Sequence, residues 1–174
     1  MRTKYKINSI YNTHFTGSQV WDLFSQEAIM MENTWNRSIR LMFGLPLQTH
    51  RYFICPISES EHLKSMLIKR FLNFTVKLEN SPKNSVRHLF KHVQNDVQSI
   101  CGSNLRNIRL LLGKDDQYKL VPSDARDINY FPVDDENRWR IDFLKELVDL
   151  KHGDLNIGLN HDEIYEIIED ICTS

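Results

Sequence analysis

The chain has few of the residues that interrupt helices or cross-link a fold. Its 174 residues include six glycines, five prolines and three cysteines. So few helix-breaking residues permit long helices. Cys55, Cys101 and Cys172 are an odd number without paired spacing, which argues against a disulfide framework. They predict free thiols in a reducing, intracellular compartment, either nuclear or cytoplasmic.

Long apolar runs are also missing. No window approaches the roughly 20 apolar residues of a membrane span, and no apolar run follows the basic residues near the N-terminus. The sequence therefore predicts neither a membrane span nor a secretory signal. Hydrophobic residues make up 41% of the chain and aromatic residues 10%, which is enough to build a core. We expect one domain or two small ones.

Recognisable catalytic motifs are absent as well. There is no glycine-rich phosphate loop, G-x-S-x-G, H-E-x-x-H or C-x-x-C pattern. The adjacent acids Asp134 and Asp135 precede a helical pattern and fit a helix cap better than a magnesium site. His88 and His92 share a helix face, but a set of four zinc ligands does not accompany them. We assign no catalytic residue, no metal and no cofactor.

The charges are divided unevenly along the chain. The net charge is −1, yet residues 1–114 contain sixteen Lys and Arg against seven Asp and Glu, whereas residues 115–174 contain six against sixteen. Such asymmetry suggests a polyanionic partner for the basic part. The alternative is that the two parts neutralise each other, and composition alone leaves both open.

Hydrophobic periodicity predicts a mainly α-helical fold with little strand. We expect helices at Ser18–Phe43, from Glu59 or Ser60 to Glu79, after Ser85, at Ser103–Leu112, from Asp134 or Asp135 to Gly153, and from Asn160 onward. Between the first two, residues 45–57 contain Pro46 and Pro56 and predict a buried, extended connector. The polar stretch after Gly113 predicts a short strand at Tyr118–Val121 or a brief helix at Ser123–Ile128.

The spacing of the apolar residues also predicts which face of each helix is buried. The expected core residues are Trp21, Phe24, Ala28, Met31, Trp35, Ile39, Met42, Leu63, Met66, Leu67, Phe71, Phe74, Leu78, Val86, Leu89, Phe90, Val93, Trp139, Phe143, Leu144, Leu147, Leu150, Ile164, Ile167, Ile168 and Ile171. The expected domains are a basic helical bundle over 1–114, a polar linker over 115–133 and an acidic helical segment over 134–174.

Basic residues recur on these helices outside the apolar faces. The candidate nucleic-acid-binding residues are Arg37, Arg40, His50, Arg51, Lys69, Arg70, Arg87 and Lys91. If the helix faces align, such a stripe can follow a phosphate backbone, and Tyr52 and Phe53 could stack on bases beside it. The alternative is that each helix has an independent solvated basic face. The sequence offers no motif for reading base sequence.

Four blocks of the chain resemble the C-terminal end of the reverse transcriptase of non-LTR, LINE-class (jockey-like) retrotransposons. The blocks are "FTGSQVWDLFS" (Phe15–Ser25), "TWNRSIRLMFGLPLQTHRYFICPISES" (Thr34–Ser60), "HLKSMLIKRFLNF" (His62–Phe74) and "YFPVDDENRWRIDFLKELVDLKHG" (Tyr130–Gly153). The resemblance implies a thumb-like helical bundle over 1–114, which grips primer–template duplex along its backbone, followed by a small helical appendage. The expected partner is RNA–DNA hybrid or DNA duplex, bound without sequence preference.

The sequence departs from that family in one decisive respect. The aromatic-Ala-Asp-Asp box of the polymerase palm is absent, so the carboxylates that hold two metals for phosphoryl transfer are missing. We therefore expect a remnant that binds nucleic acid and is not an enzyme on its own. The alternatives are a helical protein–protein interaction module, with the acidic segment offering a surface to a protein partner, and an inert truncated fragment.

Overall fold

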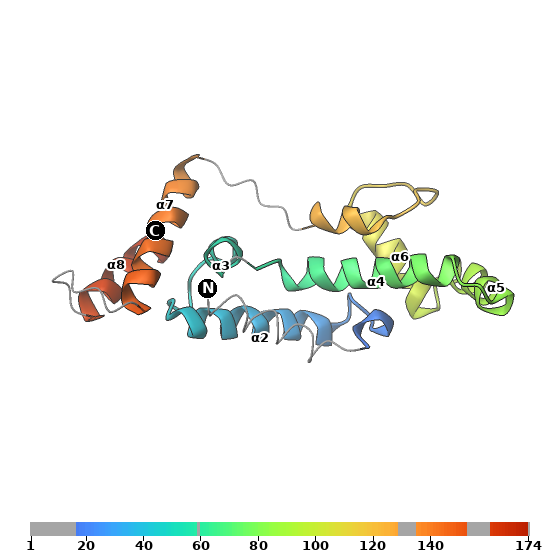
Figure 1. Ribbon diagram of the computed structural model, residues 1–174, viewed down its shortest axis with the longest axis horizontal. Coiled ribbons are helices and arrows are strands. Elements are labelled where there is room, and N and C mark those ends of the chain that lie inside the picture. The colour runs from blue at the N-terminus through green and yellow to red at the C-terminus, as the bar shows by residue number, and fades with distance from the viewer. Residues whose placement is uncertain (1–16, 59, 129–134, 153–160, 174) are drawn as a thin grey trace. The chain divides into compact units, whose positions relative to one another are not determined.

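A computed structural model of the chain describes residues 17–58, 60–128, 135–152 and 161–173 (Figure 1). It is mainly helical, with 72% helix, and no strand occurs among the described residues, which confirms the predicted fold class. The elements in chain order are η1 (Ser18–Val20), α2 (Gln26–Phe43), α3 (Arg51–Ser58), α4 (Leu63–Glu79), α5 (Asn84–Val93), α6 (Ile100–Leu111), η2 (Pro122–Arg126), α7 (Asp135–His152) and α8 (His161–Thr173).

The chain forms two compact units. The first unit comprises Met1–Glu32 and His62–Tyr130, and the second comprises Asn33–Glu61 and Phe131–Ser174. This division differs from the predicted domains. The chain crosses between the units inside α2 and again before α4, and the predicted linker over 115–133 falls mostly within the first unit.

Helix α2 begins eight residues later than the sequence predicted, and polar side chains explain why. The Asp22 carboxylate accepts a hydrogen bond from the Phe24 N–H at 3.0 Å, which closes a turn. The Ser25 hydroxyl accepts from the Ala28 N–H at 3.2 Å, as an N-cap side chain does. The prediction of one helix from Ser18 to Phe43 was therefore wrong, because these two residues place the helix start at Gln26.

The predicted core face of this first segment is only partly correct. Ile39 is buried as predicted, but Trp21 and Trp35 are half-buried rather than enclosed. Leu23 and Phe43, which were not predicted, are buried. The phase of the stripe shifts because residues 21–25 form a turn and do not continue the helix.

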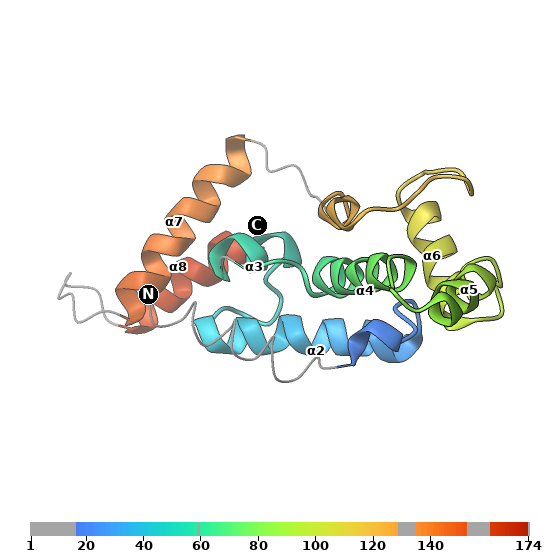
Figure 2. The same ribbon diagram turned by 45° about the vertical axis from the view of Figure 1, so that its right-hand side comes forward.

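Helix α4 is the centre of the first unit, where η1, α5 and η2 pack against it (Figures 1 and 2). Its buried residues are Leu63, Met66, Leu67, Ile68, Phe71, Leu72 and Thr75. Four of these match the predicted face, while Ile68 and Leu72 widen it and Phe74 and Leu78 are half-buried. A wide apolar face is what a helix needs when neighbours contact it from several sides.

The segment after α6 is a folded part of the first unit. The brief helix predicted at Ser123–Ile128 corresponds to η2, whereas the alternative strand at Tyr118–Val121 does not form. The Asp124 carboxylate accepts hydrogen bonds from the Val121 N–H at 2.8 Å and the Tyr118 hydroxyl at 3.2 Å. Ser65 of α4 donates to the Ile128 carbonyl at 2.7 Å, which ties the end of this segment to the central helix.

Residues 51–58 form helix α3, so the predicted extended connector was wrong. Phe53, Ile54 and Ile57 are buried, and their i, i+1, i+4 spacing suits one helix face. Pro56 lies in the last turn of this eight-residue helix. Because proline has no backbone N–H, one hydrogen bond near the end of this short helix is missing, and the rest of the helix is unaffected.

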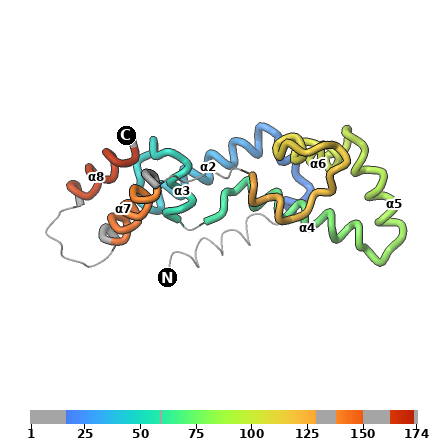
Figure 3. The backbone as a smooth tube through the Cα atoms, turned by 90° about the horizontal axis from the view of Figure 1, so that it is seen from above, coloured from blue at the N-terminus to red at the C-terminus, as the bar shows by residue number. Residues whose placement is uncertain are grey.

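The core of the second unit lies where α7 contacts α3 and α8 (Figure 3). Leu144 and Leu147 are buried as predicted, together with Ile141 and Val148. Trp139 and Phe143 were predicted to be buried but are 54% and 39% exposed. The side chain of Leu150 lies outside the described residues. On α8, Ile164 and Ile168 are buried as predicted, Ile167 and Ile171 are half-buried, and Cys172 completes the stripe.

Candidate nucleic-acid interface

Helix α5 presents the clearest basic surface in the first unit. Arg87, His88, Lys91 and His92 are all exposed, as predicted, and the helix contains no acidic residue. Phe90 is buried and anchors the opposite side against the rest of the unit. Leu89 was predicted to face the core but is 64% exposed, because the buried side centres on Phe90 with Val86 and Val93 half-buried.

Lys83 was not among the candidate residues predicted from the sequence. It lies at the N-terminal end of this helix and is exposed. Lys83, Arg87 and Lys91 are spaced i, i+4, i+8, so successive side chains lie about 6 Å apart along the helix axis. That spacing is visible in the sequence and could have identified Lys83. The three cations form one row along α5.

The basic character extends over the whole of α4, α5 and α6. Residues 63–111 contain nine Lys and Arg residues and only two acids, Glu79 and Asp96. Glu79 forms an ion pair with Lys119, with 2.9 Å between Oε1 and Nζ, so a cation outside these helices already neutralises its charge. A phosphate backbone brought to this region would meet an excess of positive charge.

Not every predicted or nearby cation of the first unit is equally available. Lys69 and Arg70 on α4 are half-buried and make other contacts. Arg109 on α6 donates from Nε to the Tyr118 carbonyl at 2.9 Å and holds the segment after α6. Lys64 lies over the Phe24 ring, 4.9 Å from its centroid. On α5, the Arg87 Nη2 donates to the Asn84 Oδ1, but both side chains are exposed, so the row on α5 is the best-defined part of the surface.

The other four candidate residues belong to the second unit. Arg37, His50 and Arg51 are exposed, and His50 stacks on Tyr52 with ring centroids 5.4 Å apart. Arg40 is different, because its Nε and Nη2 both donate to the Thr49 carbonyl, at 3.0 and 2.6 Å. This guanidinium closes the turn between α2 and α3.

Two buried residues, Thr49 and Cys172, lie beside the Arg40 guanidinium. Burial lowers the pKa of Arg40, and the neighbouring Cys172 thiol opposes that change. Burial likewise raises the pKa of Cys172, while the Thr49 hydroxyl and the Arg40 charge oppose the rise. The arrangement links the α2–α3 turn to α8 and gives Arg40 a structural role.

Tyr52 and Phe53, which were predicted to stack on bases, are not both accessible. Phe53 is 1% exposed and packs in the core of the second unit, whereas Tyr52 is half-buried. Their rings lie 4.1 Å apart at 46°. The prediction that both rings could stack on bases was therefore wrong for Phe53.

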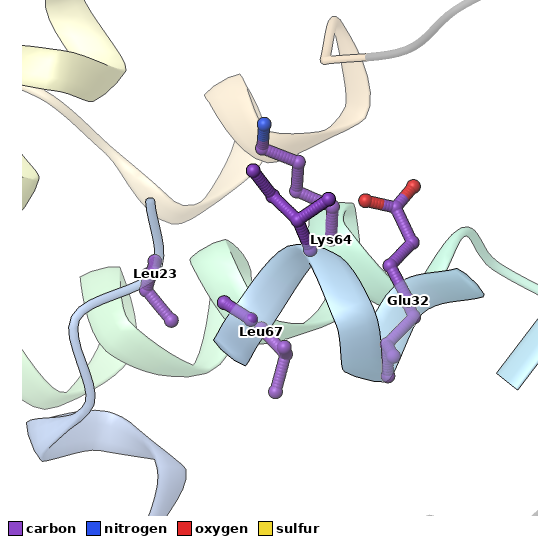
Figure 4. Close-up of a pocket in the computed structure, with 7 residues that line it drawn as sticks. Leu23, Glu32, Lys64 and Leu67 are labelled. Carbon is purple, nitrogen blue, oxygen red and sulfur yellow. The ribbon is translucent and has the colours of Figure 1, made fainter. Parts of the chain in front are cut away.

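A shallow pocket opens in the first unit between the start of α2 and α4 (Figure 4). Its walls are the aliphatic side chains of Leu23, Ala28, Ile29, Leu63 and Leu67. Glu32 and Lys64 complete the lining, with one charge of each sign.

Within the described ranges, no three His, Cys, Asp or Glu side chains gather closely enough to hold a metal ion. In the same part of the chain, no helix combines the length and the apolar character needed to cross a membrane.

Comparisons with protein-family models, with curated protein sequences and with solved structures find no match for this chain.

Proposed function

We propose that this chain binds nucleic-acid duplex through the backbone phosphates, without sequence preference, as the thumb-like remnant of a non-LTR retrotransposon reverse transcriptase. The observation that supports the proposal is the exposed, acid-free row of Lys83, Arg87 and Lys91 on α5. Phosphate contacts from lysine and arginine position a protein on a duplex but carry no sequence information. The sequence resemblance supports a thumb-like role for the helical bundle over 1–114, although the four matching blocks do not include α5.

The proposal assigns the contact surface mainly to the first unit. In that unit, Arg87 and Lys91 are the primary phosphate contacts, and Lys83 and the two histidines of α5 flank them. Lys69 and Arg70 are secondary because they are half-buried. Arg37, His50 and Arg51 remain candidates in the second unit. Arg40 is removed from the proposed surface because its guanidinium donates hydrogen bonds to the Thr49 carbonyl. The chain supplies no polymerase active site in this proposal.

The test is fluorescence anisotropy of the full chain with a labelled RNA–DNA hybrid, repeated across a range of salt concentrations. Each phosphate neutralised on B-DNA contributes about −0.9 to the slope of log K against log salt. We expect the double variant Arg87→Gln with Lys91→Gln to weaken binding and to reduce the slope by about 2. Labelled DNA duplex in parallel separates hybrid preference from general duplex binding.

The matched control is Lys114→Gln with Arg126→Gln, which removes the same charge from exposed positions of the first unit outside α5. This control should bind hybrid nearly as tightly as the parent chain. If both double variants lose the same affinity, only net charge matters, and the α5 row is not the contact surface. Absence of binding at low salt by folded protein would overturn the proposal as a whole.

A further inference from the structure

Two aromatic side chains of α7 are partly exposed to solvent. Trp139 is 54% exposed and Phe143 is 39% exposed. They are one helical turn apart, and their ring centroids lie 6.5 Å from each other at 45°. An exposed tryptophan beside an exposed phenylalanine is the type of surface that marks an interaction site.

The charges around this pair restrict the kind of partner. Asp142, Glu146 and Asp149 are exposed on α7, and so is the cation Arg138, directly before Trp139. With 3.6 residues per turn, the three acids share the outer side of the helix with the two aromatic residues. Asp142 and Glu146 are the charged residues closest to the two rings on this side of the helix. A cationic surface fits well, because it meets both the carboxylates and the faces of the rings.

We infer that the aromatic pair of α7 docks helix α5 of a second copy of this chain. Helix α5 is the on-chain surface with matching chemistry, since Arg87 and Lys91 lie one turn apart on an exposed face without an acid. Arginine and lysine over tryptophan or phenylalanine gain cation–π attraction, and the same cations pair with the flanking acids. The contact uses the cations of the proposed nucleic-acid surface but does not require that proposed function.

The contact joins different surfaces on the two copies, so it is a head-to-tail interface. Two short helix faces bury an area near the low end of the interface range, below about 1,200 Å². The association is therefore weak and sensitive to salt. Nucleic acid and the second copy compete for Arg87 and Lys91, so hybrid binding dissociates the assembly.

The experiment is sedimentation velocity of the full chain over a concentration series at low and high salt. The average sedimentation coefficient should rise with concentration at low salt and much less at high salt. Two double variants test the two surfaces: Trp139→Ala with Phe143→Ala, and Arg87→Glu with Lys91→Glu. Each alone should weaken self-association at least about tenfold. The control is Lys114→Glu with Arg126→Glu, which should still associate.

Mixing the two surface variants gives the sharpest result. Each keeps the surface that the other lacks, so the mixture should form heterodimers although neither variant associates alone. Failure of the mixture to associate, or a parent chain that stays monomeric at every concentration, would overturn the inference. If Trp139→Ala with Phe143→Ala proves unfolded by circular dichroism, Glu146→Lys with Asp149→Lys should abolish association by charge repulsion, and retained association would overturn the inference.

Fluorescence anisotropy of the variant Trp139→Ala with Phe143→Ala, using labelled RNA–DNA hybrid, separates this inference from the proposed function. We expect hybrid affinity no weaker than that of the parent chain, because Trp139 and Phe143 do not contact nucleic acid and their loss frees Arg87 and Lys91 from the second copy. A loss of affinity would instead make the pair a base-stacking platform and overturn the docking inference. Self-association without any hybrid binding would remove the proposed function and leave the docking inference standing.

Discussion

The Asn104 side chain holds the backbone on both sides of Asp22, more than eighty positions earlier in the chain. Its Oδ1 accepts a hydrogen bond from the Leu23 N–H at 3.0 Å, and its Nδ2 donates to the Trp21 carbonyl at 2.7 Å. Asn104 itself is 0% exposed. One buried amide therefore satisfies a donor and an acceptor of the turn that precedes α2 and attaches that turn to α6.

Replacing this amide should destabilise the first unit. Asn104→Ala leaves the Leu23 N–H and the Trp21 carbonyl without their partner, and each unsatisfied group costs about 1–3 kcal/mol. We expect a loss of about 2–4 kcal/mol in the free energy of unfolding, measured by urea denaturation. Asn107→Ala on the same helix is the control, and it should cost less than about 1 kcal/mol. Equal losses in the two variants would show that the bridge contributes little.

Gly102 of α6 should tolerate no side chain. A Cβ at this position would lie 2.8 Å from the Val93 carbonyl oxygen and closer still to the Asp96 carbonyl oxygen. Both obstacles are backbone atoms, which cannot rotate away as a side chain can. We expect Gly102→Ala to lower the thermal midpoint and to cost about 1–3 kcal/mol, although alanine is normally the better helix former.

Ser103→Ala is the control for Gly102, because it adds no atom and lies next to it in the same helix. Its effect should stay within about 0.5 kcal/mol. If Gly102→Ala is instead as stable as the parent chain, the turn between α5 and α6 must shift readily, and the close backbone approach is not a constraint.

The sequence predicted those helices whose signals are local. Periodicity placed α4, α5 and α8 within a few residues. Gly113, which follows α6, has a φ of +63° that suits glycine. The start of α2 was missed because Asp22 and Ser25 act through single hydrogen bonds that a long apolar stripe hides. Helix α3 was missed because two prolines suggested an extended segment.

The candidate site was predictable only in part, for a physical reason. Periodicity is enough to place Arg87 and Lys91 outside the core, so their exposure followed from the sequence. Arg40 looked equivalent in the sequence, yet the Thr49 carbonyl lies within reach of its guanidinium. Tertiary contacts also decide the phase of α7, where Ile141 and Val148 are buried and Trp139 is exposed. No local pattern encodes these partners.

Arg40 should therefore affect stability rather than nucleic-acid binding. Arg40→Gln removes two hydrogen bonds from a charged donor to the Thr49 carbonyl, and we expect a loss of about 1.5–3 kcal/mol in the free energy of unfolding. Arg37→Gln, which alters an exposed residue of the same helix, should change stability by less than about 0.5 kcal/mol. Urea denaturation of both variants measures the difference.

Binding measurements on the same two variants complete this test. At temperatures where Arg40→Gln is folded, its salt slope for RNA–DNA hybrid should equal that of the parent chain, because the guanidinium makes no phosphate contact. A slope reduced by about 1 in Arg40→Gln would return this residue to the contact surface.

The pKa of Tyr118 offers a prediction about the effect of a neighbouring charge. Burial raises its pKa above the ordinary 10.0, and the charge and hydrogen bond of Asp124 raise it further, with a smaller effect from Asp127. Asp124→Asn removes the negative charge but keeps an oxygen that can accept from the Val121 N–H. The pKa of Tyr118 should therefore fall towards 10.0 but remain above it. Ultraviolet titration of tyrosinate, taken as the difference from a Tyr118→Phe background, measures the change.

Asp127→Asn is the matched control, and it should lower the Tyr118 pKa less than Asp124→Asn does, because Asp127 is the weakest of the causes. The sign for stability follows from linkage. A pKa raised by folding means that the unfolded phenol loses its proton first, so stability is complete below pH 10.0 and falls as the pH rises through the folded pKa. Asp124→Asn should reduce that alkaline loss. An equal response to both substitutions would show that the 3.2 Å contact between Tyr118 and Asp124 does not set the titration.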